Sequence, residues 1–300
     1  MSKRRSSRNI RQRLIRLLAA YLCTVLLPLT AAAESVNQAA VTIIIDDLGY
    51  NLDYGMRAVA LPGPVTFAVL PFSPHSKELA EAAHREGKEI MLHMPMDNDN
   101  HKPLGPGGLT EQLSRSAFTN RLEQAIRSIP HISGVNNHMG SKLTQNPLKM
   151  NWVMNSLKQH TLYFVDSRTS AGSVAGSTAQ RQHIPNLDRD VFLDHDPRPA
   201  AIDAQFRRLI KIAKRTGSAV AIGHPYPSTL GYLENVIPKL DAMGIRLVSP
   251  SGLLILKRTI AMQNAAPTTT HHLAANSAPA KTPGYCTITE ELDRRLVHCG

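Results

Sequence analysis

Two adjacent carboxylates, Asp46 and Asp47, directly follow the apolar run 41–45. A β-branched run of that length predicts a buried strand that ends at the two acids. Ionised carboxylates are costly to bury unless they are paired or bound to a cation. The alternative is a pair that only caps the next turn or helix. Because one acid is enough for a cap, the second acid favours a binding or catalytic site.

Polar side chains follow four further predicted strands in the same way. They are His93 and Asp97; Asn136, Asn137 and His138; Asp166 and Arg168; and His224. A single histidine after a strand is more often structural than functional. Ligands of α/β proteins bind at the carboxyl ends of the strands, however, so repetition at five strand ends predicts one shared site.

The residue types in this set suit metal-dependent hydrolysis. Neutral imidazoles with a carboxylate are typical ligands of zinc and related divalent ions, so Asp47, His93 and His138 are predicted to bind a divalent metal, with zinc preferred. Such a metal activates water and polarises a carbonyl oxygen. Asp46 is then predicted to be the general base and His224 the general acid. A serine hydrolase is not supported, because no serine lies in a Gly-x-Ser-x-Gly motif.

The elements that would position these residues alternate along the chain. The predicted strands are 41–45, 65–70, 89–92, 132–136, 162–166, 191–193, 219–222 and 246–248. Amphipathic helical patterns lie between them, and the last is broken by Pro238 and closed by Gly244. This alternation predicts a parallel α/β fold, either a barrel or an open doubly wound sheet. Nucleotide binding is disfavoured, because the sequence has no glycine-rich phosphate loop.

The first 33 residues are typical of a secretory signal peptide. Basic residues precede an apolar stretch, 17–29, and an alanine-rich exit before Glu34. We therefore expect a periplasmic protein without a membrane span after cleavage. An uncleaved anchor is the alternative, although the apolar run is short for a full span. Leu22 precedes Cys23 where a lipoprotein signal needs a small residue, so lipidation is not expected.

Most of the excess positive charge belongs to this segment. The chain has 34 Lys and Arg against 23 Asp and Glu, and seven of the basic residues lie in 1–33. The rest of the chain has 27 Lys and Arg against 23 Asp and Glu, which gives a net charge of about +4. Nucleic acid is therefore not an expected partner, since no basic run alternates with aromatic residues either.

The composition changes again near the C-terminus. We assign 34–258 to a catalytic domain and 259–300 to a low-complexity tail, rich in Thr, His, Ala, Ser and Pro. Cys286 and Cys299 lie in this tail. They either close a small disulfide loop in an oxidising compartment or remain unpaired thiols.

Seven short segments together carry a recognisable signature. They are Ile-Ile-Ile-Asp-Asp-Leu-Gly (43–49), Thr-Phe-Ala-Val-Leu-Pro (66–71), Leu-His-Met-Pro-Met (92–96), Gly-Val-Asn-Asn-His-Met-Gly-Ser (134–141), Phe-Val-Asp-Ser-Arg-Thr (164–169), Val-Phe-Leu-Asp (191–194) and Ala-Ile-Gly-His-Pro (221–225). Over about 40–256 the sequence resembles the divergent polysaccharide deacetylases, a branch of the NodB-like carbohydrate esterases. The resemblance implies a distorted (β/α) barrel of about seven strands and metal-dependent removal of acetyl groups from N-acetylated sugars.

The resemblance also implies roles for individual positions. In the main family the first Asp of the pair is the base, the second binds metal, and a late histidine is the acid, which matches Asp46, Asp47 and His224. The family's His-x-x-x-His pair matches His93 and Asp97, so His138 is predicted to replace the missing ligand. Other candidates for that ligand are Asp97, Asp194 and His195. The main family's Arg-Pro motif is absent, and Arg168 is an open candidate for its role.

We therefore predict an exported hydrolase that deacetylates an envelope glycan, with Asn137, Asp166 and Arg168 contacting the substrate. Peptidoglycan is the nearest candidate, from the compartment alone. The alternative is a non-catalytic envelope protein that uses the same fold to bind glycan or a protein partner. A phosphoester hydrolase is disfavoured, because no basic cluster near the strand ends would hold phosphate.

Overall fold

The computed structural model describes residues 38–265. The predicted signal peptide, Cys286 and Cys299 lie outside this range. The strands are β1 (Ala39–Leu48), β2 (Thr66–Val69), β3 (Ile90–Met96), β4 (Ile132–Met139), β5 (Tyr163–Asp166), β6 (Asn186–Asp188), β7 (Val191–Phe192), β8 (Ser218–Gly223) and β9 (Ile245–Leu247). The helices are α2 (Leu52–Val59), α3 (Ser76–Arg85), α4 (Arg115–Ser128), α5 (Pro147–Gln159), α6 (Ala175–Arg181), α7 (Pro199–Thr216), α8 (Pro227–Val236) and α9 (Pro250–Ala265).

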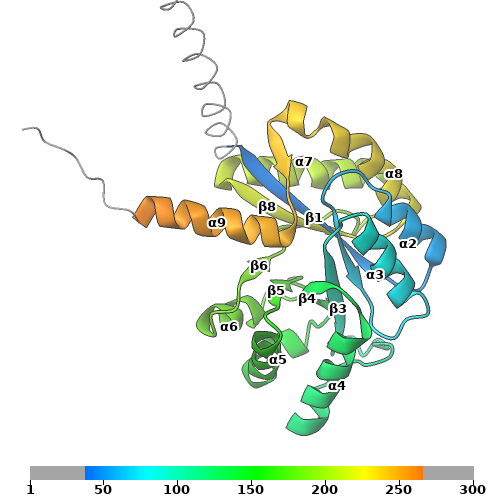
Figure 1. Cartoon of the computed structure of the whole chain (residues 1–300), viewed down its shortest axis with the longest axis vertical. Helices are drawn as coiled ribbons and strands as arrows, with labels where there is room; N and C mark the ends of the chain where they lie inside the picture. Colours follow the sequence, from blue (N-terminus) through cyan, green and yellow to red (C-terminus); the bar gives the residue numbers. More distant parts are fainter. Residues whose placement is uncertain (1–37, 266–300) are drawn as a thin grey trace, which may run out of the picture.

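Within the described range the nine strands form one parallel sheet (Figure 1). Its order is β6-β5-β4-β3-β2-β1-β8-β7, and β9 pairs with β1 outside this path. Two residues, Arg189 and Asp190, connect β6 at one end of the order to β7 at the other. Such a link spans at most about 11 Å, so the sheet must curl until its ends approach each other. The distorted (β/α) barrel is thereby confirmed, with nine strands rather than about seven.

Side chains alternate between two apolar layers along each strand. Val41, Ile43 and Ile45 of β1 belong to the larger cluster, which the surrounding helices cover. Ala40 and Ile44 belong to a smaller cluster inside the barrel. This alternation decides which polar side chains at the strand ends face the barrel interior.

Helix α9 closes part of the barrel and lies beside β6 and β1 (Figure 1). Its buried Leu253 belongs to the interior cluster, and the half-buried Leu256 packs against the same cluster. The first turn is held by Glu89 just before β3, which accepts a hydrogen bond from the Ser251 backbone N–H at 3.1 Å and one from the Ser251 hydroxyl. Glu89 also accepts a hydrogen bond from Tyr163 at 2.5 Å.

Helix starts follow ordinary capping chemistry. Asn51, Ser114 and Asn146 each accept a hydrogen bond from the backbone N–H three residues later, at the starts of α2, α4 and α5. The predicted break at Pro238 is confirmed, because α8 ends at Val236 and a short 3-10 turn, η2 (Ile237–Lys239), follows.

Two features differ from the sequence-based expectation. Strand β6 was not predicted, because its three residues contain one apolar side chain and give no periodic signal. Helix α9 continues to Ala265, past the boundary expected at 258. No helix in 38–265 is long and apolar enough to cross a membrane.

Candidate metal centre

The strands direct the site residues into one end of the barrel by their two-residue alternation. On β3, Met91 belongs to the interior cluster, and His93 lies two positions further along the same face. On β4, Asn136 and His138 share one face. After β8, His224 continues the face of the interior residue Ile222. All these residues lie at the carboxyl ends of parallel strands, where α/β barrels form their active sites.

A β-bulge in β1 brings both acids to the same site. Ile45 pairs with Phe67 and Leu48 pairs with Val69, so Asp46 and Asp47 together oppose the single residue Ala68. Asp47 adopts a left-handed conformation with φ of 60°. Adjacent residues of a regular strand point to opposite faces, and a bulge changes the direction of one of them. The predicted shared location of the two carboxylates therefore depends on this local irregularity.

The three predicted metal ligands converge. Asp47 Oδ1 lies 2.8 Å from His138 Nδ1 and 3.1 Å from His93 Nε2. The two imidazole nitrogens are 3.2 Å apart. Burial raises the pKa of Asp47, but the contacts with His138 and His93 outweigh it and hold that pKa well below its ordinary value. Asp47 is therefore ionised at neutral pH and available as a ligand.

These residues fit a divalent cation. Within the described residues, the buried Asp47 Oδ1 has no hydrogen-bond donor in suitable geometry, despite the two nearby imidazoles. Donor atoms about 2.1 Å from a shared tetrahedral metal are separated by roughly 3.4 Å, close to the spacings observed here. The combination of two imidazoles and a carboxylate is typical of catalytic zinc sites, which reserve a position for water. The group Asp47, His93 and His138 can therefore hold a metal ion.

Asn136 supports this group and was not among the predicted site residues. Its Oδ1 lies 2.7 Å from His93 Nδ1, and its Nδ2 donates to Asp46 Oδ1 at 2.8 Å. Because Asn136 Oδ1 can only accept a hydrogen bond, His93 carries its proton on Nδ1 and donates it to Asn136. The lone pair of His93 Nε2 then points toward Asp47 and His138. The alternation of Gly134, Asn136 and His138 along β4 is the sequence signal that would have identified it.

Replacing Asn136 with alanine should weaken zinc binding by about 10–100-fold, the usual cost of losing a residue that orients a metal-binding histidine. Competition with a chromophoric zinc chelator would measure this change. The matched control is Asn235→Ala, since Asn235 is exposed on α8 and bonds only the Gly231 carbonyl in the described structure. Equal zinc affinity in Asn136→Ala and the unaltered protein would contradict the role assigned to Asn136.

Asp46 and His224 both lie close to the metal group. Asp46 is 2% exposed, and its Oδ2 is 3.6 Å from His93 Nε2. Burial raises the pKa of Asp46, and the charges of His93 and His224 lower it by a smaller amount. The pKa of Asp46 therefore lies above its ordinary value. His224 Nε2 lies 3.9 Å from Asp47 Oδ2. The two predicted proton-transfer groups therefore lie beside the metal ligands.

Asp194 orients His224. The two Asp194 oxygens accept from the His224 ring Nδ1 at 2.9 Å and from the His224 backbone N–H at 2.6 Å. Thr229 donates a further hydrogen bond to Asp194 at 2.7 Å. Burial lowers the pKa of His224, but Asp194, with smaller contributions from Asp47 and Asp46, raises it to about 9. Asp194 thus supports the acid and does not join the metal ligands.

Other predicted residues lie elsewhere. Asn137 is buried on the opposite face of β4, where it bonds the Met139 carbonyl and the Ser167 N–H. Asp166 is fully buried and accepts hydrogen bonds from the Arg168 N–H and the Ser173 hydroxyl. Both side chains make hydrogen bonds within the fold, and their contact with substrate stays a prediction. Arg168 is half-buried, and its contact with substrate stays a prediction.

Asp97 and His195 also lie outside the metal group. Asp97 accepts hydrogen bonds from the backbone N–H groups of Asn98 and Glu111 and pairs with Lys142. His195 is exposed after β7. Of the alternatives for the third ligand, His138 is the one that the structure places beside Asp47 and His93.

A cleft of about 580 Å³ opens above the metal group. Asp47, His138 and His224 line its floor, and Tyr50, Tyr54 and Tyr226 with several prolines and Leu104 line its walls. Of the described residues, no lysine or arginine lines it. An uncharged ligand with apolar faces suits this lining better than a phosphate ester.

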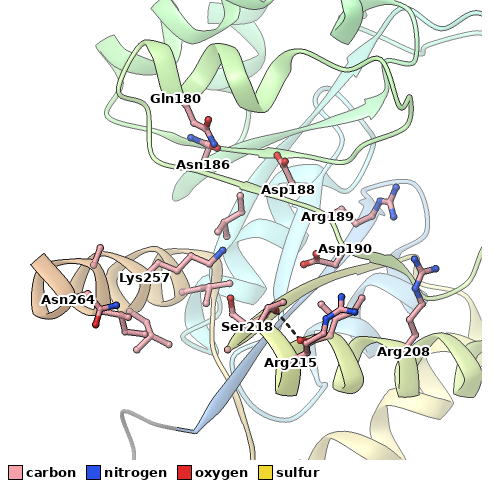
Figure 2. Close-up of a pocket in the computed structure, with 18 residues that line it drawn as sticks. Gln180, Asn186, Asp188, Arg189, Asp190, Arg208, Arg215, Ser218, Lys257 and Asn264 are labelled. Atoms are coloured by element: carbon pink, nitrogen blue, oxygen red, sulfur yellow. Dashed lines mark hydrogen bonds between the residues drawn. The ribbon is translucent and has the colours of Figure 1, made fainter.

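A larger hollow of about 800 Å³ lies at the other end of β8, against α7, α9 and the β6–β7 link (Figure 2). Ser218 at the start of β8 lines it, whereas His224 follows the end of that strand. Figure 2 shows charges of both signs around it, with Arg208, Arg215 and Lys257 beside Asp188 and Asp190. None of the predicted site residues lines this hollow.

The parallel barrel and the Asp-His-His group at the carboxyl ends of its strands agree with the arrangement expected from the sequence resemblance. The family model for divergent polysaccharide deacetylases matches residues 43–254. The chain belongs to this family.

The chain is also similar to two curated relatives and to a solved structure. The uncharacterized protein YibQ of Escherichia coli K12 is 38% identical over 226 residues, which cover 75% of this chain and 70% of YibQ. An uncharacterized protein of Haemophilus influenzae is 36% identical over 200 residues, which cover 67% of this chain and 71% of the Haemophilus protein. The crystal structure of the uncharacterized protein ATU2773 from Agrobacterium tumefaciens C58 is similar in fold, with a TM-score of 0.70 and 24% identity, covering 72% of this chain and 89% of ATU2773.

Proposed function

We propose that this protein is an exported, metal-dependent hydrolase that removes acetyl groups from an N-acetylated envelope glycan. The observation that carries the proposal is the placement of Asp46 and His224 beside the three-ligand group Asp47, His93 and His138. A site that only bound a ligand would need neither a buried carboxylate of raised pKa nor an imidazolium oriented by a second carboxylate.

Asp47, His93 and His138 would hold the metal. A bound divalent ion lowers the pKa of water and polarises a carbonyl oxygen. Asp46 accepts a proton from water as the water oxygen bonds to the acetyl carbon, and its raised pKa makes it a stronger base than an exposed aspartate. His224, protonated and oriented by Asp194, donates its proton to the nitrogen as the C–N bond breaks. The products are acetate and a free amine.

The cleft supports a glycan as substrate class. Its walls present tyrosine rings and prolines, and among the described residues no lysine or arginine lines it to bind phosphate. The tyrosines combine an apolar ring with a polar hydroxyl, which suits a sugar that has apolar C–H faces and hydroxyl edges. Periplasmic location and peptidoglycan as the natural polymer are part of the proposal and are supported by the signal-type sequence of 1–33.

Acetate release from N-acetylglucosamine oligosaccharides and from peptidoglycan tests the proposal. We expect release by zinc-loaded protein, loss of release after chelation, and recovery when zinc is returned, because the activated water depends on the metal. Heat-denatured protein with the same zinc content is the control for acetate set free by the ion alone. Intact protein that binds zinc and glycan but releases no acetate would overturn the hydrolase and favour the non-catalytic glycan-binding alternative.

A further inference from the structure

We propose that the substrate of this site is an extended chain that crosses the 103–108 loop and stacks a second sugar on Phe72, outside the catalytic cleft. The inference rests on the proposed function and adds a subsite to it. The structure places an exposed aromatic ring on each side of this loop, and the surface between the two rings is continuous.

The catalytic cleft continues beyond its own walls. Leu104 and Gly105 line the cleft and also a neighbouring hollow of about 490 Å³. Phe72 and Gln124 line that hollow and also the next one, of about 550 Å³, which reaches α3 and α4. A chain that leaves the metal group over Leu104 and Gly105 therefore arrives at Phe72. A single sugar would occupy only the first of these spaces.

Phe72 is held in an unfavourable conformation with its side chain exposed. Its φ is 59°, a region that bulky residues rarely adopt, and its side chain is 43% exposed. Neither burial nor backbone preference accounts for a phenylalanine at this position. Strained residues of this kind cluster at functional sites, where the surrounding structure maintains them.

The Phe72 ring is fixed against the 103–108 loop. A Cβ on Gly107 would lie 2.7 Å from Phe72 Cε2 and 3.0 Å from Cδ2, so only a glycine lets the ring approach this closely. Gly107 itself has φ of 79°, which glycine adopts readily. The ring is therefore supported on one side by backbone, and its exposed part can receive a ligand.

Backbone hydrogen bonds connect both the turn that contains Phe72 and the 103–108 loop to the strands that carry the metal ligands. The turn that contains Phe72 follows Leu70, whose N–H donates to Leu48 of β1 at 2.9 Å, and the N–H of His75 donates to Gly49 at 2.9 Å. The 103–108 loop ends at Leu109, whose N–H donates to the Pro95 carbonyl of β3 at 2.8 Å. The distance from Phe72 to the metal ligands on β1 and β3 is thereby fixed.

Tyr50 lines the catalytic cleft together with Gly105 of this loop. It is 54% exposed, and its hydroxyl lies 3.4 Å from the position of a Cβ on Gly105. The Phe72 ring thus lies against Gly107, and the Tyr50 hydroxyl reaches Gly105 of the same loop. Flat rings with electron-rich faces attract the polarised C–H groups of sugar rings, and a neutral polymer presents such groups at regular intervals. An extended N-acetylated glycan is the occupant that matches two such rings.

Substitution of Phe72 by asparagine tests this subsite, because asparagine tolerates the left-handed backbone. In an Asp46→Asn background, which slows turnover, we expect Phe72→Asn to weaken binding of the N-acetylglucosamine hexasaccharide by about tenfold, or about 1.4 kcal/mol. Binding of the disaccharide should not change. Isothermal titration calorimetry measures both. Leu148→Asn, which removes a 57% exposed apolar side chain from α5, is the matched control.

Each outcome decides a separate point. A Phe72→Asn protein that binds the hexasaccharide as tightly as the background overturns the subsite, as does equal weakening of the disaccharide and the hexasaccharide. Failure of every variant to bind either oligosaccharide also overturns it. Phe72-dependent binding of the hexasaccharide by a protein whose native form releases no acetate leaves the subsite standing and rejects the hydrolase. An unchanged melting temperature in Phe72→Asn separates lost binding from lost folding.

Discussion

Replacing Asp46 with asparagine should reduce acetate release by about 10²–10⁴-fold, the range for losing a positioned general base. The amide keeps the size of the carboxylate but cannot accept a proton from water. Asp46 is 2% exposed, so bulk solvent cannot easily supply another base at the same position. Steady-state rates on an N-acetylated oligosaccharide would measure the effect, and zinc content should stay unchanged because Asp46 is not one of the three ligands.

The control for this substitution is Asp241→Asn. Asp241 is exposed on the surface, so its replacement repeats the chemical change far from the site. Full activity in Asp46→Asn would show that another group takes the proton. Reduced activity together with reduced zinc content would move Asp46 from the role of base to that of a metal ligand or its support.

Replacing His138 with alanine should remove the metal. Two ligands would remain on Asp47 and His93, fewer than the three or four protein ligands found in zinc sites. We expect bound zinc to fall from about one ion per chain to near zero, measured by elemental analysis after dialysis. The melting temperature should then no longer respond to zinc, because a ligand that binds only the native state stabilises it by about 4 kcal/mol at a thousandfold excess over its Kd.

His160→Ala is the matched control for the histidine substitution. His160 follows α5 and pairs with Glu123 at 2.7 Å, away from the barrel interior. Full zinc retention in His138→Ala would place the third ligand elsewhere. Asp97 would then need to leave its hydrogen bonds to Asn98 and Glu111, and Asp194 would need to release His224.

The fold was largely predictable because most of its strands are apolar runs that alternate with amphipathic helices. All eight predicted strand segments are confirmed, and the chain breaks at Pro238 and Gly244 as expected. Strand β6 carries one buried side chain, Leu187, and forms because β5 offers it an unpaired edge. Such a strand depends on tertiary pairing, which local sequence does not report.

The site was predictable where strand ends could be counted, and less so where side-chain direction mattered. His93, His138 and His224 were placed correctly at one end of the barrel from their positions after apolar runs. Asn136 and Asn137 are adjacent and chemically identical, yet only Asn136 reaches His93 and Asp46. Side chains two residues apart on a strand share a face, so the position of His138 would have selected Asn136 over Asn137.

The position of Asp47 could not be predicted by the same rule. Strict alternation would place Asp46 inside the barrel and Asp47 outside it. The bulge against Ala68 and the left-handed backbone of Asp47 overturn that alternation. Aspartate tolerates this conformation better than most residues, which is compatible with the acid pair but does not identify the bulge in advance.

The sheet order also has a consequence for how the protein is assembled. β1 carries both acids and is the first of the described strands to be synthesised, but its neighbours are β2 on one side and β8 and β9 on the other. Thr42 of β1 reaches Val248 for a hydrogen bond across 206 positions of sequence. Contacts of such long range make folding slow, because the intervening chain must be ordered before they can form.

Until β8 is available, β1 has one open edge, and exposed edges of apolar strands invite pairing with other chains. A nascent or truncated chain that stops before residue 218 would contain Asp46, Asp47, His93 and His138 yet lack both the strand that covers β1 and the histidine that follows it. His224, the proposed proton donor, is therefore the last of these site residues to be synthesised. Incomplete chains would carry the aggregation hazard without it.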